Sequence, residues 1–218
     1  MSCTSDKRGF TLIEMAIVLV IIGLILAAVT KGQDLVQSAQ QKKFYSSFVK
    51  AWELAVISYQ DRTGHLLMDG TDNGGTKSTT DGHFDSTPGS GTIGSAPAAL
   101  ERVGLESALP ATNTDNSYTY KISGKYSGEQ TVKVTLEYVS TVGNYIRFTN
   151  IPTDVAMGMD AIIDGDIKGK RTSYSSGNNE ELFMQSSPTP PSFDGDAPGW
   201  SDPQTQKTVQ AIYRLTFT

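Results

Sequence analysis

The most pronounced pattern in the sequence is an apolar run close to its start. From Phe10 to Val29 the only charged residue is Glu14. Because an α-helix rises about 1.5 Å per residue, this run covers about 30 Å, the thickness of the hydrocarbon core of a bilayer. The pattern therefore predicts a membrane-spanning helix over residues 10–30.

A second helical pattern follows directly, over residues 31–62. Proline is absent from this stretch, and apolar residues return every three or four positions: Phe44, Phe48, Trp52, Ala55 and Tyr59. Such spacing aligns them along one face of a helix. It predicts that the helix continues as an amphipathic half lying against a folded domain, with a total length of about 80 Å.

Beyond residue 62 the apolar period changes to two, which is typical of strands. Tyr, Val, Ile and Thr are concentrated at residues 117–126, 130–141 and 144–149, and a closing strand is predicted at 208–218. Short helices are predicted at residues 96–109 and 151–163, and polar loops at 63–95 and 172–206.

Residues 63–218 are accordingly expected to form one globular domain. The predicted fold class is α+β: a long N-terminal α-helix, half membrane-spanning and half amphipathic, packed on a small antiparallel β-sheet with long loops.

The charge inside the apolar run requires an explanation. A carboxylate in this setting costs about 2–3 kcal/mol, so a segment that served only as an anchor would not need Glu14. The residues before it are Lys7, Arg8, Gly9 and Phe10, and together with the following four they read KRGFTLIE.

This octet resembles the leader of type IV pilins and type II secretion pseudopilins. The resemblance implies that residues 1–9 are a leader, removed by a prepilin peptidase that cuts between Gly9 and Phe10 and methylates the new N-terminus of Phe10. Glu14 would be the family's glutamate, which pairs with the N-terminus of a neighbouring subunit. The close resemblance extends from Lys7 to about Gly64, and the helix proline frequent in the family is absent.

The resemblance implies a non-enzymatic structural subunit, a minor pilin or pseudopilin, of a type IV pilus (fimbrium) or a type II secretion filament. Its expected partners are the prepilin peptidase and methyltransferase, other pilin or pseudopilin subunits, an inner-membrane assembly platform, and membrane lipid before assembly. Lys7 and Arg8 favour a cytoplasmic N-terminus, which places the C-terminal domain in the periplasm until a periplasmic or cell-surface filament forms.

Two alternatives stay open. One is a major pilin; the other is a bitopic, signal-anchored membrane protein whose external domain binds a ligand or catalyses a reaction. The resemblance also does not distinguish among a pilus, a secretion system and a DNA-uptake machine, because all three use this N-terminal chemistry.

Charge and cysteine content narrow the remaining chemistry. The formal net charge is −5, which argues against nucleic-acid binding by the whole surface, although Lys168, Lys170 and Arg171 form a small basic patch. Cys3 is the only cysteine and lies in the leader, so the processed chain would have no disulfide. We find no catalytic or nucleotide-binding motif, and we interpret His65 and His83 as loop residues.

Aspartates recur beside glycines in two places. Asp69, Asp72, Asp81 and Asp85 lie in the first polar loop, and Asp160, Asp164 and Asp166 lie at the end of the second short helix. Oxygen-rich loops can bind calcium, but aspartate and glycine are also common turn formers. No other cofactor is expected, and Asp160, Asp164 and Asp166 are the candidate calcium ligands.

Overall fold

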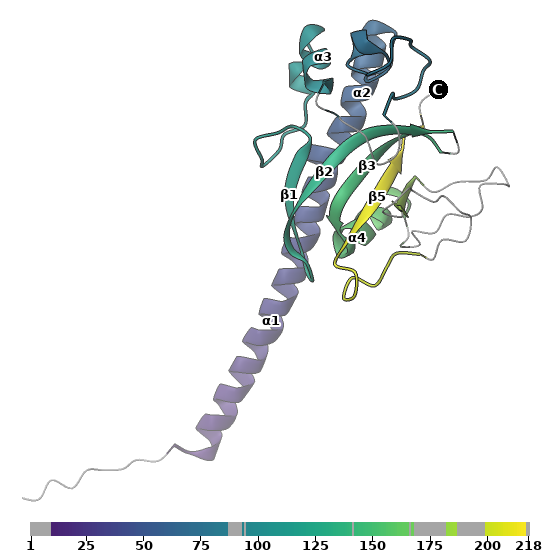
Figure 1. The fold of residues 1–218 in the computed structure, drawn as a ribbon. Coiled ribbons are helices and arrows are strands. Elements are labelled where there is room, and N and C mark those ends of the chain that lie inside the picture. The colour runs from purple at the N-terminus through teal and green to yellow at the C-terminus, as the bar shows by residue number, and fades with distance from the viewer. Residues whose placement is uncertain are drawn as a thin grey trace, which may run out of the picture. The chain divides into compact units, whose positions relative to one another are not determined.

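The computed structural model describes residues 10–86, 93, 95–140, 142–165, 167, 182–186 and 199–216. The chain divides into two compact units, Met1–Ala39 and Gln40–Thr218. The helix α1, Leu12–Phe44, begins in the first unit and ends in the second (Figure 1).

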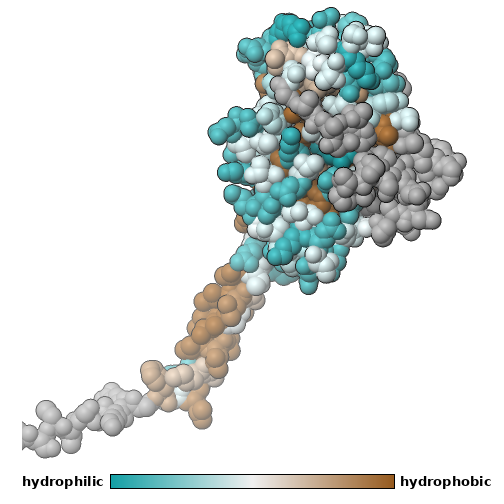
Figure 2. Space-filling model, in the orientation of Figure 1, coloured by the Kyte–Doolittle hydropathy of each residue, from teal (hydrophilic) through white to brown (hydrophobic). Residues whose placement is uncertain are grey.

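The first unit presents its apolar side chains to the outside. Phe10 is 79% exposed and Leu12 is 93% exposed, and the large aliphatic side chains that follow are exposed as well. Figure 2 shows this part of α1 as a largely hydrophobic surface. The helix is long and apolar enough to cross a membrane, which agrees with the predicted span.

The predicted amphipathic half is helical, but it is not a continuous α-helix. A π-helical turn, η1 (Tyr45–Val49), separates α1 from α2 (Lys50–Thr63). The hydroxyls of Ser46 and Ser47 both donate to the carbonyl oxygen of Lys43, at 3.2 and 2.6 Å. Because such bonds compete with the α-helical ladder, they account for the wider turn.

The sheet has five antiparallel strands in the order β1-β2-β3-β5-β4. Their bounds are Thr119–Gly124 for β1, Gly128–Val139 for β2, Gly143–Pro152 for β3, Phe183–Ser186 for β4 and Thr208–Arg214 for β5. The predicted meander and closing strand are thus confirmed. The short β4 falls inside a stretch that the sequence predicts as a polar loop.

The short helices also follow the sequence pattern, with one difference. Helix α4, Thr153–Ile163, begins directly after Pro152 as expected. The stretch predicted as one helix at 96–109 is instead α3 (Ala96–Arg102) and the 3-10 turn η3 (Glu106–Ala108). Gly104 separates them with φ of 72°, a left-handed conformation that glycine adopts at little cost.

Within the second unit the core lies between the helix and one face of the sheet. Phe44, Phe48 and Trp52 are fully buried, and so are the alternating strand residues Val134, Leu136, Ile146 and Phe148. The ring of Phe44 contacts that of Tyr120 edge-on, with centroids 5.1 Å apart. Burial of each such side chain contributes about 1.5–3 kcal/mol. The aromatic stripe predicted from the sequence is therefore core.

The opposite face of the sheet carries a buried ion pair. The guanidinium Nε of Arg147 lies 2.9 Å from Oε2 of Glu137, and each residue is 1% exposed. Tyr145 and Thr135 donate to the two carboxylate oxygens of Glu137, both at 2.9 Å. These four residues alternate on β2 and β3 with the core residues, so one face of the sheet is apolar and the other contains a buried polar network.

Candidate functional site

The glutamate of the apolar run takes part in the N-terminal cap of its own helix. The backbone N–H and the hydroxyl of Thr11 donate to Oε2 of Glu14, at 2.7 and 2.8 Å. In return the backbone N–H of Glu14 donates to the hydroxyl oxygen of Thr11 at 3.3 Å. This reciprocal arrangement is a capping box, and it satisfies backbone donors that a helix start otherwise leaves unpaired.

The cap occupies one carboxylate oxygen and leaves the other open. Both bonds from Thr11 reach Oε2, and within the described residues Oε1 has no hydrogen-bond partner. Around Glu14 lies an exposed apolar surface formed by Phe10, Met15 and Val18. The site therefore presents one carboxylate oxygen that makes no hydrogen bond within the described residues, on an exposed apolar surface.

The predicted cleavage site lies at the edge of the described chain. Phe10 is the first described residue and is exposed, while Gly9, Lys7 and Arg8 lie outside the described residues. Cleavage between Gly9 and Phe10 and methylation of Phe10 stay predictions.

Two of the three candidate calcium ligands, Asp160 and Asp164, accept hydrogen bonds from other parts of the fold. Asp160 accepts a hydrogen bond from the indole N–H of Trp200 at 2.8 Å. Asp164 accepts from the backbone N–H groups of Leu182 and Phe183, at 3.0 and 2.8 Å. Asp166 lies outside the described residues, as does the basic patch at 168–171. Within the described part of the chain, no three acidic, histidine or cysteine side chains are placed to share a metal.

In the first polar loop, Asp85 is a structural staple. Its Oδ2 accepts from the backbone N–H groups of Gly70, Thr76 and Lys77, at 3.0, 2.7 and 2.8 Å. A Cβ at Gly75 would collide with the same carboxylate, so a larger residue does not fit there. Charge-assisted bonds of this kind are about twice as strong as neutral ones, and Asp85 is 5% exposed.

Asp69 closes the other part of the loop. Its Oδ1 accepts from the N–H of Asp81 at 3.0 Å and its Oδ2 from the N–H of Gly82 at 2.8 Å. Spacing alone could not reveal either staple, because the donors are backbone groups up to 15 residues away. The two carboxylates hold the loop in a chain whose only cysteine is Cys3.

Neither histidine makes a hydrogen bond to Asp69 or Asp85 within the described residues. The ring of His83 stacks on Tyr138 with centroids 3.8 Å apart and an angle of 12° between the planes. His65 lines a polar hollow at the end of α2. Neither belongs to a group of metal ligands within the described residues.

A second polar cluster connects the helix to the sheet. Lys50 donates to Oε2 of Glu53 at 2.7 Å and to the hydroxyl of Tyr213 at 3.1 Å, and Tyr213 donates to the same Glu53 oxygen at 2.9 Å. Burial, reinforced by the nearby Glu53 carboxylate, raises the pKa of Tyr213 to about 12. The cluster joins α2 to β5.

Comparison with known proteins identifies one part of the chain. Residues 4–30 match the family model for the prokaryotic N-terminal methylation motif. No curated protein and no solved structure matches the chain. The matched residues contain the predicted cleavage position, Thr11 and Glu14, together with the whole apolar run from Phe10 to Val29.

Proposed function

We propose that this chain, whose residues 4–30 carry the methylation motif that is the signature of type IV pilins and pseudopilins, is a structural subunit of a membrane-assembled filament. The finer assignment is a minor pilin or pseudopilin of a type IV pilus or a type II secretion system. The subunit waits in the inner membrane and joins the filament through its N-terminal helix.

The observation that carries the proposal is the half-used carboxylate of Glu14. One oxygen is bound to Thr11, and the other faces outward from an exposed apolar helix. Cleavage after Gly9 would create an α-amino group on Phe10 of each subunit, which is mostly protonated at pH 7. At about 4 Å and an effective dielectric near 20, a neighbour's ammonium attracts this carboxylate by about 4 kcal/mol.

This attraction is of the same order as the penalty for placing the charge in lipid, about 2–3 kcal/mol. The capping box reduces that penalty before assembly, because the carboxylate already accepts two hydrogen bonds within its own chain. The free-energy cost of the Glu14 carboxylate is thus small enough for a single subunit in the membrane. In a filament, an ion pair between its second oxygen and a neighbour's ammonium group would make the charge favourable. The pairing would set the axial register between neighbouring helices.

The second unit supplies what an exported subunit needs outside the membrane. It has its own core between helix and sheet, and its first loop is held by Asp69 and Asp85. Lys7 and Arg8 would keep the leader in the cytoplasm, so this unit would lie in the periplasm before assembly. The peptidase, the other subunits and an assembly platform are the proposed partners.

Two other assignments compete with this one. A major pilin would share every feature of the N-terminus, while its copy number in isolated filaments would far exceed that of a minor subunit. A bitopic membrane protein would keep its leader. The mature length of 209 residues, obtained by removing nine from 218, favours a minor subunit or pseudopilin.

The first test is the intact mass of protein extracted from membranes of a host that has the peptidase. We expect loss of residues 1–9 and the addition of one methyl group. A full-length, unmethylated N-terminus in that host would overturn the proposal and favour the bitopic alternative.

A further inference from the structure

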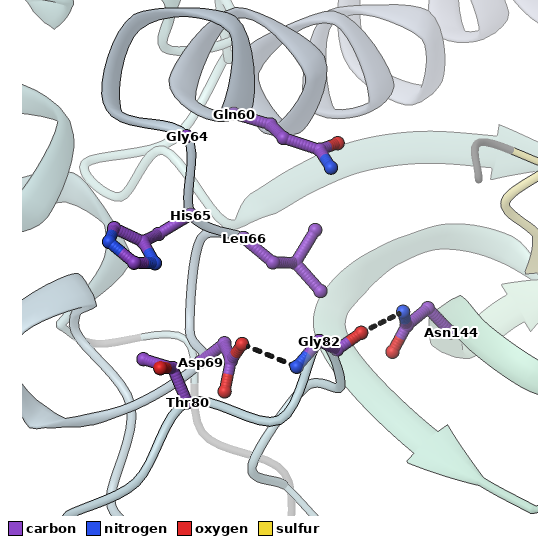
Figure 3. Close-up of a pocket in the computed structure, with 8 residues that line it drawn as sticks. All are labelled: Gln60, Gly64, His65, Leu66, Asp69, Thr80, Gly82 and Asn144. Atoms are coloured by element: carbon purple, nitrogen blue, oxygen red, sulfur yellow. Dashed lines mark hydrogen bonds between the residues drawn. The ribbon is translucent and has the colours of Figure 1, made fainter.

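A polar hollow of about 330 Å³ lies in the second unit, where α2 ends (Figure 3). Gly64 terminates α2 with φ of 74°, and the chain then turns through His65 and Leu66 along one side of the hollow. Ligand pockets in proteins measure about 300–1,000 Å³, so the volume suits a ligand of one small ring.

The wall of the hollow is fixed by hydrogen bonds from distant parts of the chain. Asp69 is 2% exposed and holds the N–H of Gly82, whose carbonyl oxygen accepts from the side chain of Asn144 at 3.0 Å. Asn144 also accepts from the N–H of Phe84 at 2.9 Å. Figure 3 shows Gly82 held in this way between Asp69 and Asn144. The shape of the hollow is therefore built into the fold before any ligand arrives.

Three polar side chains around the hollow are left with unused bonding capacity. Within the described residues, the amide of Gln60, the imidazole of His65 and the hydroxyl of Thr80 make no hydrogen bond. Each can both donate and accept. Leu66, which is 5% exposed, closes the hollow on the side to which Gln60 extends in Figure 3 and belongs to the buried core.

The charges of the lining select against ionic ligands. The described lining residues include no lysine or arginine, so an anion would find no permanently charged cationic partner. Asp69 is the carboxylate that lines the hollow, and each of its oxygens already accepts a backbone N–H. A cation would therefore have to compete with bonds that hold the loop.

We propose that this hollow binds a neutral polyhydroxyl group of the size of one hexose unit. Gln60 and Thr80 would exchange hydrogen bonds with ligand hydroxyls. The same chemistry occurs in a free monosaccharide and in one unit of a surface polysaccharide. The inference goes beyond filament assembly and does not depend on it.

The test uses the full processed chain in a detergent without a sugar headgroup. Saturation-transfer NMR would compare glucose, galactose, mannose, N-acetylglucosamine and N-acetylgalactosamine with the anion glucuronate and the cation glucosamine. We expect saturable binding of at least one neutral sugar and weaker binding of the charged analogues. A longer oligosaccharide that binds more tightly than its monosaccharide would identify a polysaccharide as the source, and equal affinities would identify the free sugar.

Two variants assign the binding to this hollow. Gln60→Ala and Thr80→Val each remove one hydrogen-bonding group, and we expect about tenfold weaker binding from each. Their melting temperatures should not change, because neither side chain makes a hydrogen bond within the described part of the chain. Gln204→Ala is the matched control, since Gln204 is exposed and bonds through its backbone N–H. The proposal is overturned if no neutral sugar binds at about 10 mM or if both variants bind like the unaltered chain.

Discussion

Asn113 pairs through its side chain with both backbone groups of Lys121. Its Oδ1 accepts from the N–H of Lys121 at 2.7 Å, and its Nδ2 donates to the carbonyl oxygen of Lys121 at 2.7 Å. Lys121 lies in β1, which forms one edge of the sheet. The asparagine thereby occupies the positions that an added strand would use.

We expect Asn113→Ala to open this edge to pairing with another chain. The fold should persist, because the side chain is exposed, but light scattering should show faster aggregation on gentle heating. Asn116→Ala is the matched control: Asn116 is exposed and bonds through its backbone carbonyl. Equal aggregation of the two variants would contradict a protective role for Asn113.

The two oxygens of Glu14 can be tested separately. Glu14→Gln keeps a carbonyl oxygen that can accept both bonds from Thr11, but it removes the charge. If charge pairing drives assembly, Glu14→Gln and Glu14→Ala should both lower incorporation into filaments at least tenfold, measured by quantitative immunoblotting of sheared filaments. Normal incorporation of Glu14→Gln together with failure of Glu14→Ala would show that the cap matters and the charge does not.

Removal of the Asp85 staple should destabilise the domain. Asp85→Ala eliminates three charge-assisted hydrogen bonds to buried or half-buried backbone, and we expect a loss of about 2–4 kcal/mol in urea unfolding. Asp115→Ala, at an exposed position, should stay within about 0.5 kcal/mol of the unaltered chain. A similar small loss for Asp85→Ala would mean that the loop does not depend on this carboxylate.

Stability should fall in strong alkali because of Tyr213. Its pKa is raised from 10.0 in the reference state to about 12 by burial and by Glu53. A raised pKa means that the neutral form stabilises the fold below pH 10, and this contribution is lost as the pH rises toward 12. We expect the free energy of unfolding to fall across this range, and Tyr213→Phe to flatten the fall. An equally steep decline in that variant would assign the effect to other groups.

Calcium binding by Asp160, Asp164 and Asp166 stays a prediction. Because Asp164 already accepts two backbone N–H groups, a bound ion would have to use its remaining lone pairs or displace those bonds. If calcium is bound, a chelator should lower the melting temperature of the purified chain and added calcium should restore it. An unchanged melting curve would leave hydrogen bonding as the role of Asp160 and Asp164.

Features that depend on neighbours in the sequence were predictable. The membrane-spanning run, the aromatic stripe of Phe44, Phe48 and Trp52 and the alternation in β2 and β3 all follow from local periodicity. The capping box was not predicted, although Thr11 and Glu14 are separated by the three-residue step that this motif requires. That both bonds from Thr11 reach one oxygen of Glu14 was visible only in the structure.

The sequence by itself determined the N-terminal methylation motif and the fold class, because both depend on short, regular spacings. Tertiary structure decided the roles of the loop aspartates, the protection of the β1 edge and the hollow beside Gln60. Each of these relies on groups distant along the chain, such as Asp69 with Gly82 or Asn144 with Gly82. The residues next to a carboxylate or amide in the sequence do not indicate which backbone group it will bind. That partner is set by the positions of other segments in the folded chain.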